Sequence, residues 1–181
     1  MVVLHVKGEA EEKQFLYECS AGSPMEDVLT AVVLIHNLQS KILHLSVRLR
    51  ELFFEGSPLE TWTDSTISLY RSASEAETYA SKDQVLHKRP LLPHILRDHV
   101  QSLEKEIIVS PLMESSEVKL AQLLSDFVPL NGEMAQLWVA GKELLRGKQL
   151  CDYIGKNEKT KITVRLQSAS SDAVPDLSLC K

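Results

Sequence analysis

The sequence predicts an α+β fold, in which strands from both ends of the chain form one sheet around the start of a long helix. Apolar and polar residues alternate at 2–7, at 13–19 and again at 160–166, which is the pattern of half-buried strands. Residues 23–54 lie between them, consist mostly of good helix formers and begin with a helix-start signal. A sheet built from the two ends would therefore enclose the start of this helix.

The first two strands are expected to form a hairpin. The polar segment "KGEAEEK" between them contains a glycine and is typical of a turn. Val2, Leu4 and Val6 share one face of the first strand, and Phe15, Tyr17 and Cys19 share one side of the second. Two alternating segments joined by a short polar turn predict an antiparallel pair.

The start of the long helix carries the strongest local signal in the chain. Ser23 is a candidate N-cap, Pro24 suits the first helical position, and Glu26 stands three residues after Ser23. This is the spacing of a capping box, and acids in the first turn interact favourably with the helix dipole. We expect the helix to begin at Pro24 and to end near Phe54.

The second half of this helix carries a narrow apolar seam. Its members are spaced alternately three and four residues apart: Ile35, Leu38, Ile42, Leu45, Leu49 and Leu52. This is the a/d pattern with which one helix packs along another. We therefore expect a second helix on the seam and treat all six residues as candidate protein-binding residues.

Two later segments can supply that second helix. Each has apolar residues at helical spacing, namely Leu96, Val100, Leu103 and Ile107 in one, and Val118, Ala121, Leu124 and Val128 in the other. Two interpretations follow: an internal helical bundle, or a seam left open for a different protein. Residues 56–89 have weak periodicity and predict a loop with a short helix. Residues 168–181 lack a core pattern and predict a disordered tail.

The C-terminal segment predicts the remaining strands. Leu137 and Val139 should face the core, with Trp138 on the other face, and Gly141 and Gly147 allow chain reversals. The segment "AGKELLRGKQLCDY" resembles ubiquitin, as does the order of strands and helix. The resemblance implies a ubiquitin-like β-grasp, 1–36 with 133–167, split by a helical insertion, 37–132. Such an insertion is tolerable because closure entropy rises slowly with loop length.

Composition excludes several classes of protein. The net charge of −5 argues against general nucleic-acid binding. No apolar run approaches the roughly 20 residues of a membrane span, and no secretory signal begins the chain, so a cytoplasmic location is expected. Cys19, Cys151 and Cys180 are odd in number and widely spaced, which predicts reduced thiols without zinc.

No motif for catalysis, a cofactor or a metal is apparent. The stretch "GKELLRGKQ" departs from a phosphate-binding loop, because Gln149 stands where a Ser or Thr hydroxyl would hold magnesium. The six histidines lack metalloprotease spacing, and the chain has no G-x-S-x-G sequence. We therefore expect a protein that is not an enzyme and that binds no cofactor or metal.

The predicted binding surface is the outer face of the sheet. Between Lys142 and Arg165, seven basic residues stand against three acidic ones, so this segment is positively charged in an acidic chain. Trp138 is the candidate anchor, because aromatic side chains often dominate interfaces. The expected basic rim consists of Lys142, Lys148, Lys161 and Arg165. It would attract a partner with an acidic surface. The alternatives are an ordinary solvated face, or a Trp138 covered by the chain's own helices.

The stretches "MVVLHVKGEAEEKQFL", "AQLWVAGKEL" and "DYIGKNEKTKI" resemble the kurly family of cilia- and flagella-associated proteins. The resemblance covers 1–36 and 133–167, with Val139 and Gly141 as departures. It implies a non-catalytic protein of motile cilia, located in the cytoplasm and the axoneme. Such a protein would be either a factor for dynein-arm preassembly or an axoneme-associated subunit. The alternative is a general ubiquitin-like adaptor with no ciliary role. The ending "SLCK" lacks the Gly-Gly tail that a conjugated modifier needs.

Overall fold

A computed structural model describes residues 1–55, 58–110 and 116–169. The chain divides into two compact units. We call Met1–Val33 with Leu130–Lys181 the sheet unit, and Leu34–Pro129 the helical unit. Sequence placed the corresponding boundaries at 36/37 and 132/133. The predicted tail lies outside the described residues except for Ser168, the last residue of a strand, and Ala169.

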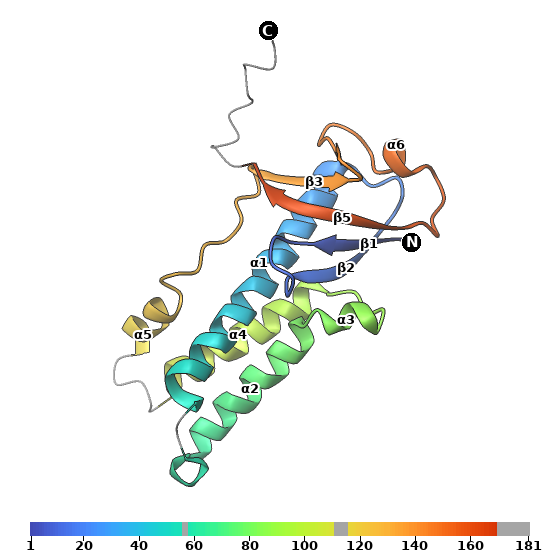
Figure 1. Ribbon diagram of the computed structural model, residues 1–181. Helices are drawn as coiled ribbons and strands as arrows, with labels where there is room; N and C mark the ends of the chain where they lie inside the picture. Colours follow the sequence, from blue (N-terminus) through green and yellow to red (C-terminus); the bar gives the residue numbers. More distant parts are fainter. Residues whose placement is uncertain (56–57, 111–115, 170–181) are drawn as a thin grey trace. The chain divides into compact units, whose positions relative to one another are not determined.

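The sheet unit contains one five-stranded mixed sheet (Figure 1). Its strands are β1 (Val2–Lys7), β2 (Gln14–Cys19), β3 (Ala135–Val139), β4 (Lys142–Glu143) and β5 (Lys161–Ser168). They lie in the order β2-β1-β5-β3-β4, with β1 parallel to β5 and the other neighbours antiparallel. The predicted pairing of the two ends of the chain is confirmed, because Val3 is opposite Lys161. The fold is of the α+β class.

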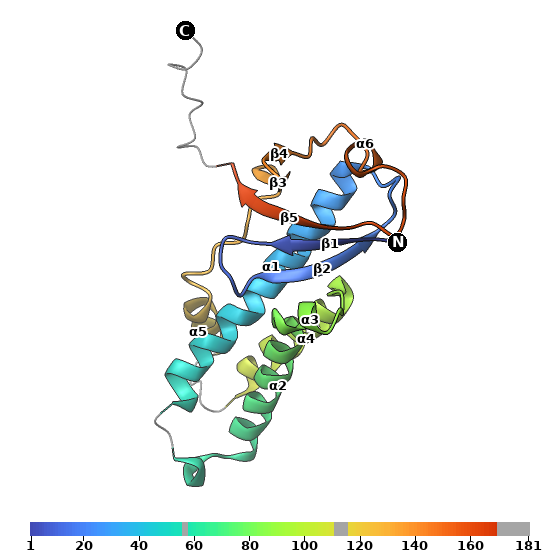
Figure 2. The same cartoon turned by 45° about the vertical axis from the view of Figure 1, so that its right-hand side comes forward.

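One face of the sheet is covered by helix α1 (Met25–Leu49), whose first half crosses it in both views (Figures 1 and 2). Strand alternation turns Leu4, Val6, Leu137 and Val164 toward this helix, and each is fully buried. The residues of α1 that complete this core are Met25, Val28, Leu29 and Val32. This burial of apolar area is the main force that holds the sheet unit together.

The start of α1 is held by the C-terminal half of the chain. The helix begins at Met25, one residue later than predicted, and the Met25 N–H donates to the Lys148 carbonyl (2.8 Å). Glu26 accepts a hydrogen bond from Arg146 Nη1 at 3.0 Å. The Arg146 guanidinium also donates to the carbonyls of Gly132 and Ala135. One side chain therefore ties the first turn of α1 to the start of β3.

The helical unit contains the rest of α1 and the helices of the middle of the chain (Figure 1). A π-helical turn, Arg50–Phe54, continues α1, and a 3₁₀ turn, Leu59–Thr61, follows. The α-helices are α2 (Asp64–Ala80), α3 (Asp83–Leu86), α4 (Pro93–Val109) and α5 (Ser116–Leu123). The short helix α6 (Cys151–Ile154) belongs to the sheet unit.

Helix α2 corrects the prediction of a loop with a short helix over 56–89. Its seventeen residues begin at an N-cap, Thr63, whose side chain accepts from the Thr66 N–H. The buried stripe is Thr66, Leu69, Ala73, Ala76 and Ala80. Most of these side chains are small, so the stripe has the spacing of a buried helix face without its usual hydrophobicity. Small residues allow α2 and α4 to lie side by side at close range.

The seam of α1 is largely buried within the chain. Ile35, Ile42, Leu45 and Leu49 have no exposed surface, whereas Leu52 is 53% exposed. Polar contacts flank the buried residues: Gln39 Nε2 donates to the Ala80 carbonyl (2.8 Å), and Lys41 pairs with Glu104 of α4 (2.6 Å). Of the two interpretations, this burial supports the internal bundle.

The predicted faces of the two later helices had different outcomes. All four predicted core residues of α4 are buried: Leu96, Val100, Leu103 and Ile107. The prediction for the next helix is wrong, because it ends at Leu123 and buries Leu123, while Ala121 and Val128 are exposed. Turns from Leu124 onward end the helix, so Val128 lies beyond it.

One segment, Met25–Leu52, is long and apolar enough to cross a membrane by length and composition. The sequence prediction overlooked it because Gln39, Ser40 and Lys41 interrupt the apolar run. About half of the most apolar window, 50%, is buried inside the protein. The same residues form the cores of the two units, and this role accounts for their apolar composition.

Candidate functional site

The outer face of the sheet carries a row of polar and aromatic side chains. The alternation that buries Val6, Val164 and Leu137 turns Lys7, Arg165 and Trp138 to the other face. Strand register places the three side by side, since Arg165 is the Cα partner of both Lys7 and Trp138. Three segments far apart in sequence thus supply one row.

A hollow with a volume of about 520 Å³ lies over this row. The residues that line it are Lys7, Trp138, Ala140, Gly141, Thr163, Val164, Arg165 and Gln167. Trp138 is half-buried, and its indole N–H donates to Gln136 Oε1 at 3.2 Å. This bond fixes the ring, so that binding costs little side-chain entropy.

The turn between β3 and β4 forms part of the rim. Ala140 and Gly141 both have positive φ, 48° and 82°, as the two central residues of a type I′ hairpin turn require. Glycine adopts this conformation freely, whereas alanine does so at a cost. The turn ends β3 one residue after Trp138 and so limits the hollow on that side.

The charge of the hollow is positive. Lys7 and Arg165 are neighbours across strands spaced about 4.8 Å apart. Within the described parts of the chain, neither forms an ion pair with a carboxylate. Two adjacent cations without a counter-ion, beside an indole and the Thr163 hydroxyl, can bind an anionic group. The hollow suits a carboxylate better than an uncharged ligand.

The predicted basic rim is only partly present. Arg165 lines the hollow, and Lys161 projects from the same face of β5 but lies four residues away. Lys142 and Lys148 instead approach the ring of Tyr153, with Nζ atoms 5.3 and 5.9 Å from its centroid. The Cα partner of Lys142 is Val139, so register assigns Lys142 to the face opposite Trp138. Placing Lys142 and Lys148 around Trp138 was therefore wrong.

Sequence alone did not point to Lys7, Thr163 or Gln167. Lys7 ends the first strand, far along the chain from Trp138, and only the parallel pairing of β1 with β5 brings it to the site. Thr163 and Gln167 alternate with the buried Val164 and Leu166. A period of two in β5 was a signal that could have identified both.

The six candidate residues of the α1 seam do not form a surface. Four of them are fully buried, Leu38 is half-buried and Leu52 is exposed. A partner could reach the buried four only if the helices of the helical unit separated. Their part in protein binding therefore stays a prediction, and the outer sheet face is the accessible candidate.

Two pKa shifts in the sheet unit reflect burial. Burial raises the pKa of the Cys19 thiol to about 11, and the Glu158 carboxylate adds to this. Burial also raises the pKa of Tyr17, helped by Cys19 and Asp27. In the helical unit, Arg50 Nη2 donates to both carboxylate oxygens of Glu77, and this raises the pKa of Arg50. Cys19 is therefore a protonated thiol at neutral pH.

The fold and the hollow define an α+β protein whose sheet presents an aromatic, cationic surface. The family model described as cilia- and flagella-associated protein 298 matches residues 135–177 of the chain. This stretch includes β3 to β5, and with them Trp138 and Arg165. No solved structure gives a significant match. The narrower prediction of a ubiquitin-like β-grasp therefore stays a prediction.

Three relatives are similar along most of the chain. Cilia- and flagella-associated protein 298 of Rattus norvegicus is 25% identical over 96% of this chain and 78% of its own length. The Danio rerio protein of that name is 27% identical with the same coverage. The Drosophila melanogaster protein is 24% identical over 92% of this chain and 76% of its own length. The similarity is thus wider than the two stretches that carry the sequence resemblance. It supports a cilia- and flagella-associated family, and the name kurly stays a prediction.

Proposed function

We propose that the chain is a non-catalytic protein-binding module of motile cilia. It would serve either as a factor for dynein-arm preassembly in the cytoplasm or as a subunit associated with the axoneme. The similarity to cilia- and flagella-associated proteins along nearly the whole chain supports the ciliary setting. The single observation that supports the binding role is the hollow over Lys7, Arg165 and Trp138.

The partner would present an acidic segment to this hollow. A carboxylate between Lys7 and Arg165 would receive two charge-assisted contacts, and an apolar group next to it would cover the Trp138 ring. The chain as a whole is acidic, with a net charge of −5. Acidic partners would therefore be repelled elsewhere and attracted to this face, which orients the encounter.

A direct test uses a short fluorescein-labelled peptide of Glu, Leu and Gly, with a peptide of Lys, Leu and Gly as its counterpart. Fluorescence anisotropy should detect the acidic peptide alone. Trp138→Ala should weaken binding by about 2 kcal/mol, or roughly thirtyfold. Arg165→Glu should abolish it, whereas Lys156→Glu should have little effect, because Lys156 is exposed in a loop and does not line the hollow. Equal binding of both peptides, or equal loss in Lys156→Glu, would contradict the assignment.

A cellular test addresses the ciliary role. Ciliated cells that lack the chain should regain motility with the natural sequence but not with the Trp138→Ala, Arg165→Glu double variant at equal abundance. Salt extraction of isolated axonemes then separates the two ciliary roles, since a subunit stays with the microtubules and a preassembly factor does not. Normal motility in cells that lack the chain would favour the general adaptor.

A further inference from the structure

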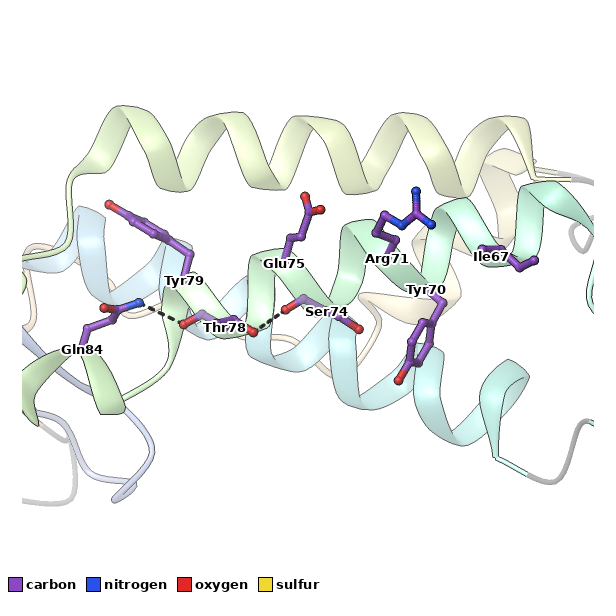
Figure 3. A pocket seen from close by; sticks show the side chains of 8 residues that line it. All are labelled: Ile67, Tyr70, Arg71, Ser74, Glu75, Thr78, Tyr79 and Gln84. Carbon is purple, nitrogen blue, oxygen red and sulfur yellow. Dashed lines mark hydrogen bonds between the residues drawn. The ribbon is translucent and has the colours of Figure 1, made fainter. Parts of the chain in front are cut away.

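The outward face of α2, in the helical unit, carries a second hollow, with a volume of about 600 Å³ (Figure 3). The stripe that α2 buries runs from Thr66 to Ala80, and the residues that line the hollow lie on the opposite side of the helix. Figure 3 shows Ile67 and Tyr70 at one end of the outward row and Tyr79 at the other. These residues are separate from those of the hollow on the outer face of the sheet.

The two ends of the row are apolar and rigid. Ile67 and Tyr70 are 42% and 47% exposed. The Tyr70 ring lies 5.2 Å from that of Phe54 and 5.3 Å from that of Trp62, measured between centroids. At the other end, the Tyr79 hydroxyl accepts from the Leu92 N–H at 3.0 Å. Fixed apolar anchors lose little entropy when a partner covers them.

The middle of the row is small and charged. Ser74 and Thr78 form a low floor, and Thr78 Oγ1 donates to the Ser74 carbonyl at 2.8 Å. Arg71 and Glu75 stand one turn apart and are both exposed. In the described part of the chain, neither takes part in an ion pair. A partner for this surface should therefore supply an acid and a base at the same spacing.

The order of residues along the row is self-complementary, so the row can pair with the same row of a second copy of the chain. Ile67 precedes Arg71 by four residues, and Tyr79 follows Glu75 by four residues. If a second α2 lies antiparallel, Arg71 meets Glu75 of the partner subunit, and Glu75 meets the partner's Arg71. Ile67 then meets the partner's Tyr79. A two-fold interface has this reciprocal form, in which residue i contacts j and j contacts i.

We propose that the outward face of α2 pairs with the same face of a second copy of this chain, in an antiparallel two-fold dimer. The small Ser74 and Thr78 side chains let the two helix axes approach to about 8–10 Å. A parallel pair is disfavoured, because it would bring Arg71 against the partner's Arg71. The proposal does not depend on the sheet-face hollow and does not involve its residues.

The dimer should be weak and reversible. A helix of 17 residues is about 25 Å long, so the two faces bury an area at the low end of specific interfaces. We expect a dissociation constant on the order of micromolar. Sedimentation equilibrium of the full chain across that range should show a monomer–dimer equilibrium. A chain that is monomeric at all concentrations would overturn the proposal.

Charge reversal gives the decisive test. Arg71→Glu places acids against acids, and Glu75→Arg places bases against bases, so each single variant should dimerise about tenfold more weakly or not at all. An equimolar mixture of the two variants restores both opposite-charge pairs, and it should form a heterodimer. Lys105→Glu is the matched control, because Lys105 is an exposed residue of α4 that does not line the hollow.

The outcomes separate cleanly when circular dichroism shows that every variant is folded. Weak self-association of both single variants, with recovery in the mixture, supports the antiparallel pairing of α2. Dimers that resist Arg71→Glu, or single variants whose mixture stays monomeric, overturn it. An equal loss in Lys105→Glu would also overturn it, since net charge would then explain the effect.

Discussion

The two units of the chain use their apolar residues differently. In the sheet unit, strand alternation buries every second side chain and leaves the others on an open face, where Trp138 and Arg165 lie next to each other. In the helical unit, the α1 seam with its a/d spacing is buried inside the chain. In both units a clear apolar pattern marks a core, whereas the accessible surface is made of the residues between.

The largest effect on stability is expected from a charge placed in the α1 seam. Leu45 is fully buried, so Leu45→Asp should lower the free energy of unfolding by about 3–5 kcal/mol or prevent folding. The milder Leu45→Ala should cost about 2–5 kcal/mol through the cavity it leaves. Urea denaturation measures both. Val47→Asp is the control on the same helix, because Val47 is 43% exposed, and an equal loss there would mean that the seam is not special.

Next in size is the effect of overfilling the small stripe of α2. Ala76 is fully buried, so Ala76→Leu should cost about 1–3 kcal/mol because the added methyl groups must displace α4 or neighbouring side chains. Thermal unfolding of this variant is compared with that of Ser65→Leu, at an exposed position of α2. Unchanged stability in Ala76→Leu would show that the stripe is loosely packed.

A third prediction concerns pH and the core of the sheet unit. The Cys19 pKa rises from an ordinary 9.0 to about 11 on folding. Between these values the unfolded thiol ionises while the folded one stays neutral, so stability should fall as pH rises from about 9 to 11. The loss should approach about 2 kcal/mol.

Chemical denaturation is measured at several pH values for the natural chain and for Cys19→Ala. The difference between the two proteins gives the contribution of the Cys19 thiol to the free energy of unfolding. The variant removes the thiol, whereas Tyr17 and the other titrating groups remain in both proteins. Below about pH 9 the two curves should run parallel, separated by the cost of removing the buried sulfur, and from pH 9 to 11 the natural chain should lose about 2 kcal/mol relative to the variant. Parallel curves over this pH range would mean that the Cys19 thiol ionises equally well in the folded core.

The smallest effect is expected at the turn beside the hollow. Ala140 has a φ of 48°, a conformation that asparagine tolerates better than alanine does. Ala140→Asn should therefore raise the free energy of unfolding by about 0.5–1 kcal/mol. Differential scanning calorimetry should show a higher Tm, and a lower Tm would contradict the I′ turn.

Much of the sheet could be predicted from sequence because its strands alternate plainly. Val2–Lys7 and the last strand were expected to pair, and Val3 lies opposite Lys161. The wrong predictions concerned which residues lie opposite each other on neighbouring strands, because the local sequence pattern does not determine strand register. Lys142 looked like a neighbour of Trp138, but the tight turn pairs it with Val139. Lys7 reached the site only through a pairing between distant segments.

The helices show a different limit. Helix α4 was recognised because its buried stripe is made of large apolar residues. Helix α2 has the same spacing, but Ala73, Ala76 and Ala80 contribute little hydrophobicity. Its buried face is therefore set by tertiary packing and could not be recognised from composition. Val128 was misplaced because helix α5 ends at Leu123, whereas the apolar spacing in the sequence continues to Val128.

The parallel pairing of β1 with β5 has a consequence for synthesis on the ribosome. Val3 leaves the ribosome well before its neighbour Lys161 is added, because the whole middle of the chain lies between them. The helical unit, Leu34–Pro129, is continuous in sequence and can fold in the meantime. The nascent hairpin must wait with one strand edge unpaired, which is when it is most exposed to aggregation or most in need of a chaperone.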